Sequence, residues 1–386
     1  MKVVIRGPLL SKSGYGEHSR QVFRWALTRG HDVRAEITPW GLTSWYVNPV
    51  ALDGLVGMIM RSSANKIDDV DMSMQVQLPN EWTPGLARRD IGITAGVEAT
   101  ISPPTWAAAC SAMSSVIVPS IFSRSSLLAG GPITSQVHVV PEAYSESFSS
   151  GRSLSRLDIQ GADETYNFLL FGQVTGNNPD TDRKNIFYTV KWFCEEFAGD
   201  RSVKLFVKTN LGTNCVFHRR MLCDMFGSLI REVRKGEFPK VSLLVGDMTI
   251  DECASLVSDR RFGAMLSLTK GEGYGLPILD AAAAGLPIIA TNWSGHLDYL
   301  KLGKFTAVDY DLVPIPAEKV DDKIFVKGAQ WAMPKEQSAK RHMRRTFLSP
   351  NVPREWASDL QRKILPALSI DTVMKAYDSV VESTFS

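Results

Sequence analysis

The sequence predicts an α/β protein with two Rossmann-like units. Around residues 262–290, two apolar runs flank a glycine-rich loop and an alanine-rich helix. The first 35 residues repeat this order, with Gly14 and Gly16 in the loop between an apolar run and a helix. Strand, glycine loop, helix and strand in succession are typical of a βαβ unit in a parallel sheet. A length of 386 residues is enough for two such domains.

The composition is that of an ordinary globular protein. Hydrophobic residues make up 44% and charged residues 22% of the chain, and the net charge is +2. This small charge does not require a nucleic-acid or membrane partner. The five cysteines are scattered without a C-x-x-C pair, which favours a reducing cytoplasm. The first residues resemble a strand rather than a signal peptide, and no run of 18 apolar residues occurs, so we expect no membrane span.

The glycine loop of the second unit has the features of an anion site. A buried strand is predicted over Phe262–Leu268, and a helix is predicted to begin at Pro277. The loop glycines allow a ligand to approach the backbone, and the helix end offers N–H groups to a phosphate. Glu272 and Asp280 would lie roughly 12 Å apart at ~1.5 Å per helical residue. Two carboxylates flanking a phosphate site suit the hydroxyl groups of a nucleotide-sugar.

The string from Glu272 to Asp280 closely resembles the signature of family-4 retaining glycosyltransferases, Glu-Gly-Phe-Gly-Leu-Pro-x-x-Glu. The resemblance implies that Glu272 contacts the donor sugar and that Asp280, one methylene shorter than the usual Glu, holds the ribose. It also implies that the backbone of the loop holds sugar and phosphate, at Gly273, Tyr274, Gly275 and Leu276. The alternatives are an ordinary strand-to-helix turn and a carboxylate that complements the helix dipole.

This family has the GT-B fold, so the resemblance implies two Rossmann-like domains facing across a cleft, with a C-terminal helix that crosses back. We expect an acceptor domain over residues 1–150, a nucleotide-sugar domain over 158–350 and a helical tail over 351–386 that packs on the first domain. The serine-rich stretch 145–155 is the predicted linker.

In the first domain, the resemblance places Gly14 and Gly16 opposite the donor. A plain βα turn would explain these glycines equally well. Glu98 follows a strand predicted over Ile91–Val97, where many family members have a histidine that faces the sugar. The carboxyl end of a parallel strand is a common place for ligand contacts. The alternative for Glu98 is an exposed or capping carboxylate.

In the second domain, three cations are phosphate candidates. Lys184 matches the family's lysine at the start of a helix, and Arg183 would replace the family's arginine, because Gln173 occupies that position. Lys208 leaves the carboxyl end of a strand predicted over Val203–Val207. A departing nucleoside diphosphate needs positive charge nearby. The alternative for Arg183 and Lys184 is a solvated pair at a helix start.

A basic run near the C-terminus is either a solvated face or an acceptor phosphate patch, and it comprises Lys340, Arg341, Arg344 and Arg345. The resemblance implies a retaining transfer from a nucleoside diphosphate sugar, UDP-linked, to a hydroxyl, without a metal or another cofactor. We expect a soluble glycan as acceptor, and hydroxymethylated bases of viral DNA are the alternative. A nucleotide-sugar isomerase using Glu98 and Glu272, or a non-catalytic binding subunit, would be different functions for the same fold. The oligomeric state is not predicted.

Overall fold

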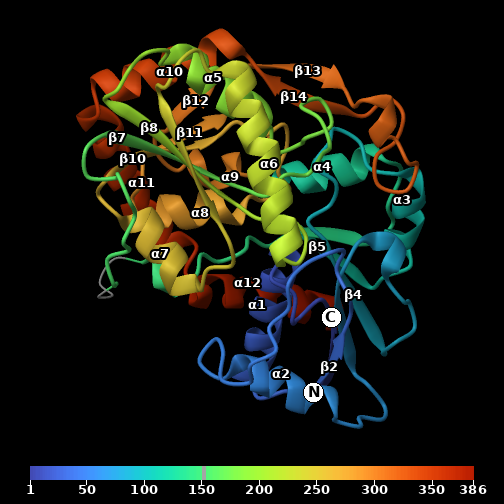
Figure 1. Cartoon of the computed structure of the whole chain (residues 1–386). Helices are drawn as coiled ribbons and strands as arrows, with labels where there is room; N and C mark the ends of the chain where they lie inside the picture. The colour runs from blue at the N-terminus through green and yellow to red at the C-terminus, as the bar shows by residue number, and fades with distance from the viewer. Residues whose placement is uncertain (150–153) are drawn as a thin grey trace. The chain divides into compact units, whose positions relative to one another are not determined.

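The computed structural model describes residues 1–149 and 154–386, which form two compact units (Figure 1). The first unit contains Met1–Ala143, Asp321–Ala329 and Ile370–Ser386; the second contains Tyr144–Val320 and Gln330–Ser369. Residues 150–153 of the predicted linker, and with them the end of the expected 1–150 domain, lie outside the described residues. None of the described helices is long and apolar enough to cross a membrane.

The first unit is built on a six-stranded sheet in the order β2-β1-β3-β4-β5-β6. Every pair of neighbours in it is parallel. The strands are β1 (Lys2–Gly7), β2 (Asp32–Ile37), β3 (Met72–Val76), β4 (Arg89–Ile93), β5 (Ser115–Val118) and β6 (Gln136–Val139). The helices are α1 (Gly14–Thr28), α2 (Leu55–Ser63), α3 (Pro104–Ser111), α4 (Ile121–Ala129) and α12 (Ile370–Phe385), with a 3-10 turn η1 (Pro79–Glu81).

The last helix of the chain completes the core of the first unit. Apolar side chains of α12 join those of β1, α1 and α2 in one buried cluster. In the interior, His18 on α1 is hydrogen-bonded through Nε2 to the Tyr377 hydroxyl at 2.8 Å. The indole of Trp25 donates to Asp378 at 2.8 Å, and Arg29 donates to both oxygens of this carboxylate. The expected return of a C-terminal helix to the first domain is therefore present in the fold.

The second unit is built on another six-stranded parallel sheet, in the order β12-β11-β10-β7-β8-β9. Its strands are β7 (Tyr166–Phe171), β8 (Val203–Thr209), β9 (Lys240–Val245), β10 (Phe262–Ser267), β11 (Ile288–Thr291) and β12 (Thr306–Val308). An antiparallel hairpin follows, formed by β13 (Tyr310–Pro314) and β14 (Gln330–Pro334). The helices are α5 (Ile186–Glu196), α6 (Val216–Val233), α7 (Ile250–Ser258), α8 (Leu276–Ala283), α9 (Leu297–Leu300), α10 (Glu336–Leu348) and α11 (Asn351–Ala367), with 3-10 turns η2 (Glu146–Phe148) and η3 (Ala317–Lys319).

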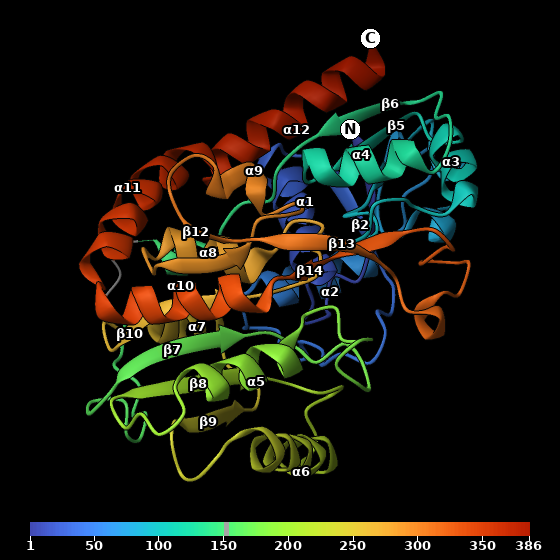
Figure 2. The same cartoon turned by 90° about the horizontal axis from the view of Figure 1, so that it is seen from above.

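Two buried layers cover the two faces of this second sheet. Because side chains alternate along a strand, Leu169 of β7 and Met265 of β10 pack with α7, α8 and α11. Their neighbours Phe168 and Leu266 pack with α5, α6 and α10 on the opposite face. Figure 2 shows α5 and α6 beside the strands β7, β8 and β9. The near-continuous apolar runs of these strands are thus buried on both sides, as a parallel sheet requires.

Several boundaries differ from the sequence prediction for local reasons. The first helix begins at Gly14, so that Gly14 and Gly16 lie in its first turn and not in the loop before it, because the Ser13 hydroxyl accepts from the Gly16 N–H at 3.1 Å and caps the helix. The strand predicted to reach Val97 ends at Ile93, because Gly96 has a positive φ of 73° and its N–H bonds to the Thr94 hydroxyl. Of the expected 351–386 tail, α11 belongs to the second unit and α12 to the first.

Candidate functional site

Two loops of the second unit leave neighbouring strands at the point where the sheet changes direction. The chain continues from β7 toward β8 and from β10 toward β11, on opposite sides of the β7–β10 pair. In open parallel sheets, ligands bind at the carboxyl ends of the strands beside such a switch point. The loop after β7 carries Arg183 and Lys184, and the loop after β10 carries Glu272. The strand order therefore brings together residues that are 88 positions apart.

Glu272 and Lys184 form the centre of this site. The Lys184 ammonium donates to both carboxylate oxygens at 2.7 Å, and the Arg183 guanidinium lies 3.6 Å from one of them. Glu272 is only 5% exposed. Burial alone would raise the pKa of this carboxyl, but the charges of Lys184 and Arg183 outweigh burial and lower the pKa to about 2. Glu272 is therefore a buried carboxylate that stays ionised and can accept hydrogen bonds at neutral pH.

The helix that follows the glycine loop begins at a glycine for steric reasons. Gly275 caps α8 with a positive φ of 89°, a conformation that other residues rarely adopt. The buried Tyr299 hydroxyl donates to the carbonyls of Tyr274 and Gly275, at 3.2 and 2.8 Å, and fixes this turn. The positive end of the α8 dipole thus lies three residues from Glu272. In the predicted helix Pro277 held the first position, and in the structure it is the second residue of α8.

Hydrogen bonds and close backbone packing hold the loop that carries Arg183 and Lys184 in one conformation. Asp182 accepts from the backbone and hydroxyl of Thr175, at 3.1 and 2.8 Å, and from the Ile186 N–H at 2.7 Å at the start of α5. A Cβ on Gly176 would lie 2.3 Å from the Thr181 carbonyl carbon, so only glycine allows this closure. The Arg183 guanidinium donates to the Gly271 carbonyl at 2.5 Å. These contacts connect the phosphate candidates directly to the glycine loop.

Lys270 is a structural residue of the site that the sequence reasoning missed. Its ammonium donates to the carbonyls of Pro179 and Asp180, both at 2.8 Å, and its backbone bonds to Arg183 and Ala332. Lys270 is 2% exposed, and burial lowers its pKa to about 8. A charged residue directly after an apolar run has to find polar partners if it is buried. This was the signal available in the sequence.

Ser294 and His296 are both buried and hold the backbone of Glu272 in place. The Glu272 N–H donates to the Ser294 hydroxyl at 2.9 Å, and its carbonyl accepts from Gly295. His296 donates from Nε2 to the Thr291 carbonyl at 2.7 Å, because a carbonyl can only accept. Burial lowers the pKa of His296, so its other nitrogen, Nδ1, faces the Ser294 hydroxyl at 3.4 Å as an acceptor.

Two further candidates already have structural partners in the second unit. The Lys208 ammonium donates to the Gly246 carbonyl at 2.6 Å and to Asn210 at 3.0 Å, joining the ends of β8 and β9. One oxygen of Asp280 accepts from the Ser145 N–H at 3.2 Å. Burial lowers the pKa of Lys208. Both residues lie at the same end of the sheet as Glu272.

The first-unit candidates lie in the first turn of α1 and in the loop after β4. A Cβ on Gly16 would lie 2.1 Å from the Ser11 carbonyl oxygen, whereas a Cβ on Gly14 would meet open space. The close packing of the loop on α1 thus explains Gly16 but not Gly14. Between them, the Tyr15 hydroxyl bonds to the Thr94 hydroxyl at 2.9 Å, and burial, then the nearby Glu98, raises the pKa of Tyr15. Glu98 is half-buried and lies five residues beyond the end of β4.

The basic run lies on α10, and two of its members are paired with acids. Lys340 lies between Glu195 and Glu336, at 2.6 and 2.5 Å. Arg344 pairs with two acids at the end of α5 and beyond it, Glu196 at 2.8 Å and Asp200 at 3.4 Å. The exposed Arg341 is 3.6 Å from Asp309, and Arg345 is exposed. Lys340 and Arg344 therefore fasten α10 to α5.

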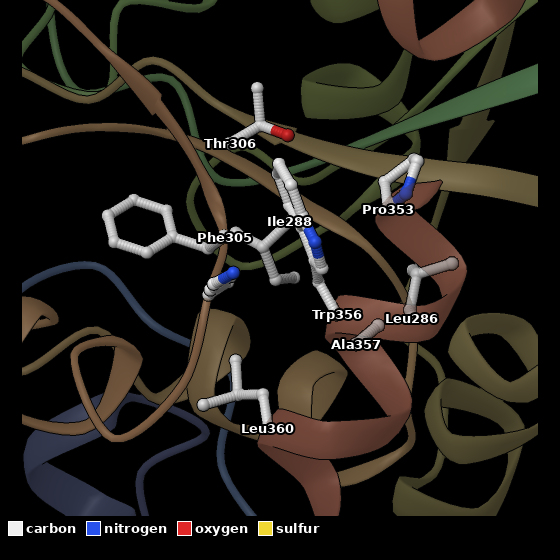
Figure 3. A pocket seen from close by; sticks show the side chains of 9 residues that line it. Leu286, Ile288, Phe305, Thr306, Pro353, Trp356, Ala357 and Leu360 are labelled. Carbon is white, nitrogen blue, oxygen red and sulfur yellow. The ribbon is translucent and has the colours of Figure 1, made fainter. Parts of the chain in front are cut away.

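The remaining clusters and pockets of the described residues offer no metal site near Glu272. Across residues 1–149 and 154–386, no three His, Cys, Asp or Glu side chains gather as metal ligands would. A small pocket of about 10 Å³ lies between α11 and the amino ends of β11 and β12. The side chains labelled around it in Figure 3 are mostly apolar. The pocket lies at the amino ends of the strands, whereas Glu272 follows the carboxyl end of β10. It has no chemical connection with the site.

Comparison with known proteins identifies the fold. No protein-family model matches the chain, and no curated protein is similar in sequence. Anabaena HepE in complex with UDP-glucose is 12% identical, with a TM-score of 0.67 over 99% of this chain and 100% of that one. Sucrose-phosphate synthase from Thermosynechococcus elongatus is 11% identical, with a TM-score of 0.67 over 100% and 99%. A trehalose-6-phosphate protein from E. coli bound with UDP-2-fluoro glucose is 9% identical, with a TM-score of 0.63 over 98% of both chains. The chain thus has the GT-B fold, and the fold prediction is confirmed.

Proposed function

We propose that this GT-B protein is a glycosyltransferase that moves a sugar from a UDP-linked donor to a hydroxyl group. The observation that carries the proposal is the ionised, buried Glu272 held by Lys184 and Arg183 beside the positive end of α8. Burying a carboxylate and two cations costs desolvation free energy, which the ion pair often does not recover. Such a group therefore favours a functional role over a purely structural one. Such a group accepts hydrogen bonds from sugar hydroxyls while the cations face a phosphate.

The chemical step requires charge stabilisation more than covalent chemistry. As the bond from the sugar to the diphosphate breaks, negative charge grows on the departing phosphate oxygen. Lys184 has three N–H donors and spends two on Glu272, so one remains for a phosphate. Arg183 and the α8 dipole add further positive potential at the same place. In this proposal the backbone of Gly273, Tyr274, Gly275 and Leu276 holds the sugar and the phosphates, and Asp280 holds the ribose.

The choice of donor rests on two proteins with the same fold. HepE was solved in complex with UDP-glucose, and the E. coli protein was bound with UDP-2-fluoro glucose. We therefore propose a UDP-linked hexose for this chain, with retention of configuration, as the family-4 resemblance implies. In the first unit we propose Glu98, Gly14 and Gly16 as candidate ligand contacts.

We propose a glycan acceptor rather than DNA, because of the charges on α10. Four carboxylates neutralise Lys340 and Arg344, which leaves Arg341 and Arg345 as exposed cations on that helix. A phosphate-binding patch needs several cations that are free to release counterions. Hydroxymethylated DNA remains the second acceptor to test.

The decisive experiment is incubation of the protein with UDP-glucose, UDP-galactose and UDP-N-acetylglucosamine, with UDP release and product mass measured together. The expected result is UDP release that increases when a glycan is added, together with a glycan heavier by one sugar. An isomerase would change the sugar without releasing UDP, and a binding subunit would do neither. Glu272→Gln is the matched control, since it keeps the shape of the side chain and removes its charge.

A further inference from the structure

A second cavity in the second unit lies beside the proposed donor site but is separate from it. Its volume is about 380 Å³, whereas the hollow lined by Lys184, Glu272 and Gly275 holds about 10 Å³. The cavity is formed by the loop after β7, by Lys270 and by the β13–β14 hairpin, all within the second unit. Ligand pockets in proteins usually measure about 300–1,000 Å³. The cavity is large enough for a ligand of its own.

One side of this cavity is apolar and belongs to the hairpin. Val313 on β13 is paired directly with Trp331 on β14, so the two side chains share a face of the ribbon. Met333 follows two residues after Trp331 and lies on that face as well, and Pro314 and Pro316 extend the wall. Trp331 is only 1% exposed, and the Lys270 ammonium lies over its ring at 5.8 Å from the centroid. The apolar surface that can meet the C–H face of a ring therefore comes mainly from Val313, Met333 and the two prolines.

The polar part of the lining comes from the loop after β7, from Lys270 and from the residues that follow β13. It consists of Asn178, Asp180, Lys270 and Glu318. The Asn178 amide donates to Glu318 at 3.5 Å, and the Tyr188 hydroxyl donates to Asp180 at 3.0 Å. Carboxylate and amide oxygens in such a row accept hydrogen bonds from hydroxyl groups.

We propose that this cavity binds a neutral saccharide ring of the acceptor. The inference rests on the proposed function and deepens it by assigning the acceptor sugar to this cavity. A pyranose has an apolar C–H face and a rim of hydroxyls, which matches one apolar wall and one row of acceptors. A nucleic acid fits poorly, because Asp180 and Glu318 repel phosphates and the Lys270 ammonium is already committed to the Pro179 and Asp180 carbonyls.

The cavity is also connected to the donor site through Lys270. This residue lines the cavity, holds the loop that leads to Arg183 and Lys184, and precedes Glu272 by two positions. Its carbonyl accepts from Ala332 on the hairpin at 3.0 Å. A saccharide in the cavity therefore contacts the same loop that positions the phosphate-binding cations.

The test uses a pair of tryptophan substitutions on adjacent residues of β13. Val313→Trp fills the cavity, whereas Leu312→Trp places the same side chain on the other, exposed face of the strand. Glu318→Ala removes one hydroxyl acceptor without filling the cavity. Binding of maltose, cellobiose, glucose and galactose is measured without donor by saturation-transfer NMR, and acceptor KM is measured with UDP-glucose. UDP binding by calorimetry serves as the check that each variant is folded.

We expect Val313→Trp to abolish the saccharide signal and raise the acceptor KM about tenfold or more, with UDP binding unchanged. Glu318→Ala should raise the acceptor KM less, and Leu312→Trp should behave as the wild type. Equal saccharide binding and acceptor KM in Val313→Trp and wild type would overturn the inference. Loss of binding to a hydroxymethylated duplex in Val313→Trp, with no saccharide bound by the wild type, would also overturn it. A wild type that binds a saccharide but never releases UDP would contradict the proposed function and leave the saccharide site standing.

Discussion

Replacing Lys184 by methionine tests the central ion pair, because methionine has a similar length and no charge. In the folded protein the pKa of Glu272 is about 2, against an ordinary value of 4.5. This difference corresponds to roughly 3 kcal/mol, at about 1.4 kcal/mol for each pKa unit. Arg183 remains 3.6 Å from Glu272 in the variant and retains part of this energy. We therefore expect Lys184→Met to destabilise the second unit by roughly 2–3 kcal/mol at neutral pH.

The sign of the pH dependence is part of this prediction. Because the pKa of Glu272 is lowered on folding, its stabilising contribution is complete above about pH 4.5 and is lost as the pH falls toward 2. Removing Lys184 raises this pKa. The stability difference between wild type and variant should thus be largest at neutral pH and shrink as the solution becomes acidic. Urea unfolding at a series of pH values, followed by tryptophan fluorescence, measures it.

The same variant should bind the nucleotide less tightly. Loss of one charge-assisted contact to phosphate costs about 1.5–3 kcal/mol, which is about ten- to a hundredfold in the Kd for UDP. Calorimetry with UDP measures this change. Lys191→Met is the matched control, because Lys191 lies on α5 in a more exposed pair with Glu195 at 2.6 Å. Lys191→Met should lower the free energy of unfolding by at most about 1 kcal/mol and leave UDP binding unchanged. If Lys184→Met and Lys191→Met have equal stability and equal affinity for UDP, the reasoning about the pair is wrong.

Three further substitutions have expected outcomes. Glu272→Gln should still fold, although the loss of the charge pair with Lys184 lowers its stability, and it should lower the rate of sugar transfer by about a hundredfold or more. Near-normal turnover would remove Glu272 from the site. Gly16→Ala should destabilise the first unit by about 1–3 kcal/mol, because its Cβ would lie 2.1 Å from the Ser11 carbonyl oxygen, whereas Gly14→Ala should not; equal unfolding midpoints would contradict this. Arg344→Ala should lower the free energy of unfolding by about 1 kcal/mol, because its ion pairs are lost. It should leave the salt dependence of any duplex binding unchanged. A gel shift with a flatter salt dependence in this variant would support α10 as a nucleic-acid surface.

The main parts of the fold could be predicted because apolar runs and glycine loops indicate the local conformation of the backbone. The position of Gly285 after α8, with a positive φ of 79°, is such a feature, because glycine commonly ends a helix in this conformation. The meeting of Lys184 and Glu272 could also be anticipated, because the carboxyl ends of parallel strands share one edge of a sheet. Both inferences use only sequence order and the geometry of parallel strands.

The remaining features depend on contacts between distant segments. The strands β13 and β14 are joined by a long connection without a short turn motif. Their pairing therefore cannot be predicted from the neighbouring residues alone. A lysine in a glycine-rich loop is usually solvated. Only the folded loop after β7 presents the Pro179 and Asp180 carbonyls that bury Lys270. The role of His296 likewise exists only once β11 and the glycine loop are adjacent.

The position of α12 has a consequence for the biosynthesis of the protein. Residues 1–143 leave the ribosome long before α12, yet their core lacks Val373, Tyr377 and Val381 until α12 is made. The first unit to be synthesised is therefore among the last to be completed. Until then the part of α1 that packs against α12, around Trp25, is open to solvent or to a chaperone. A nonsense codon just before α12 would thus damage the amino-terminal unit, although the second unit had already been translated in full.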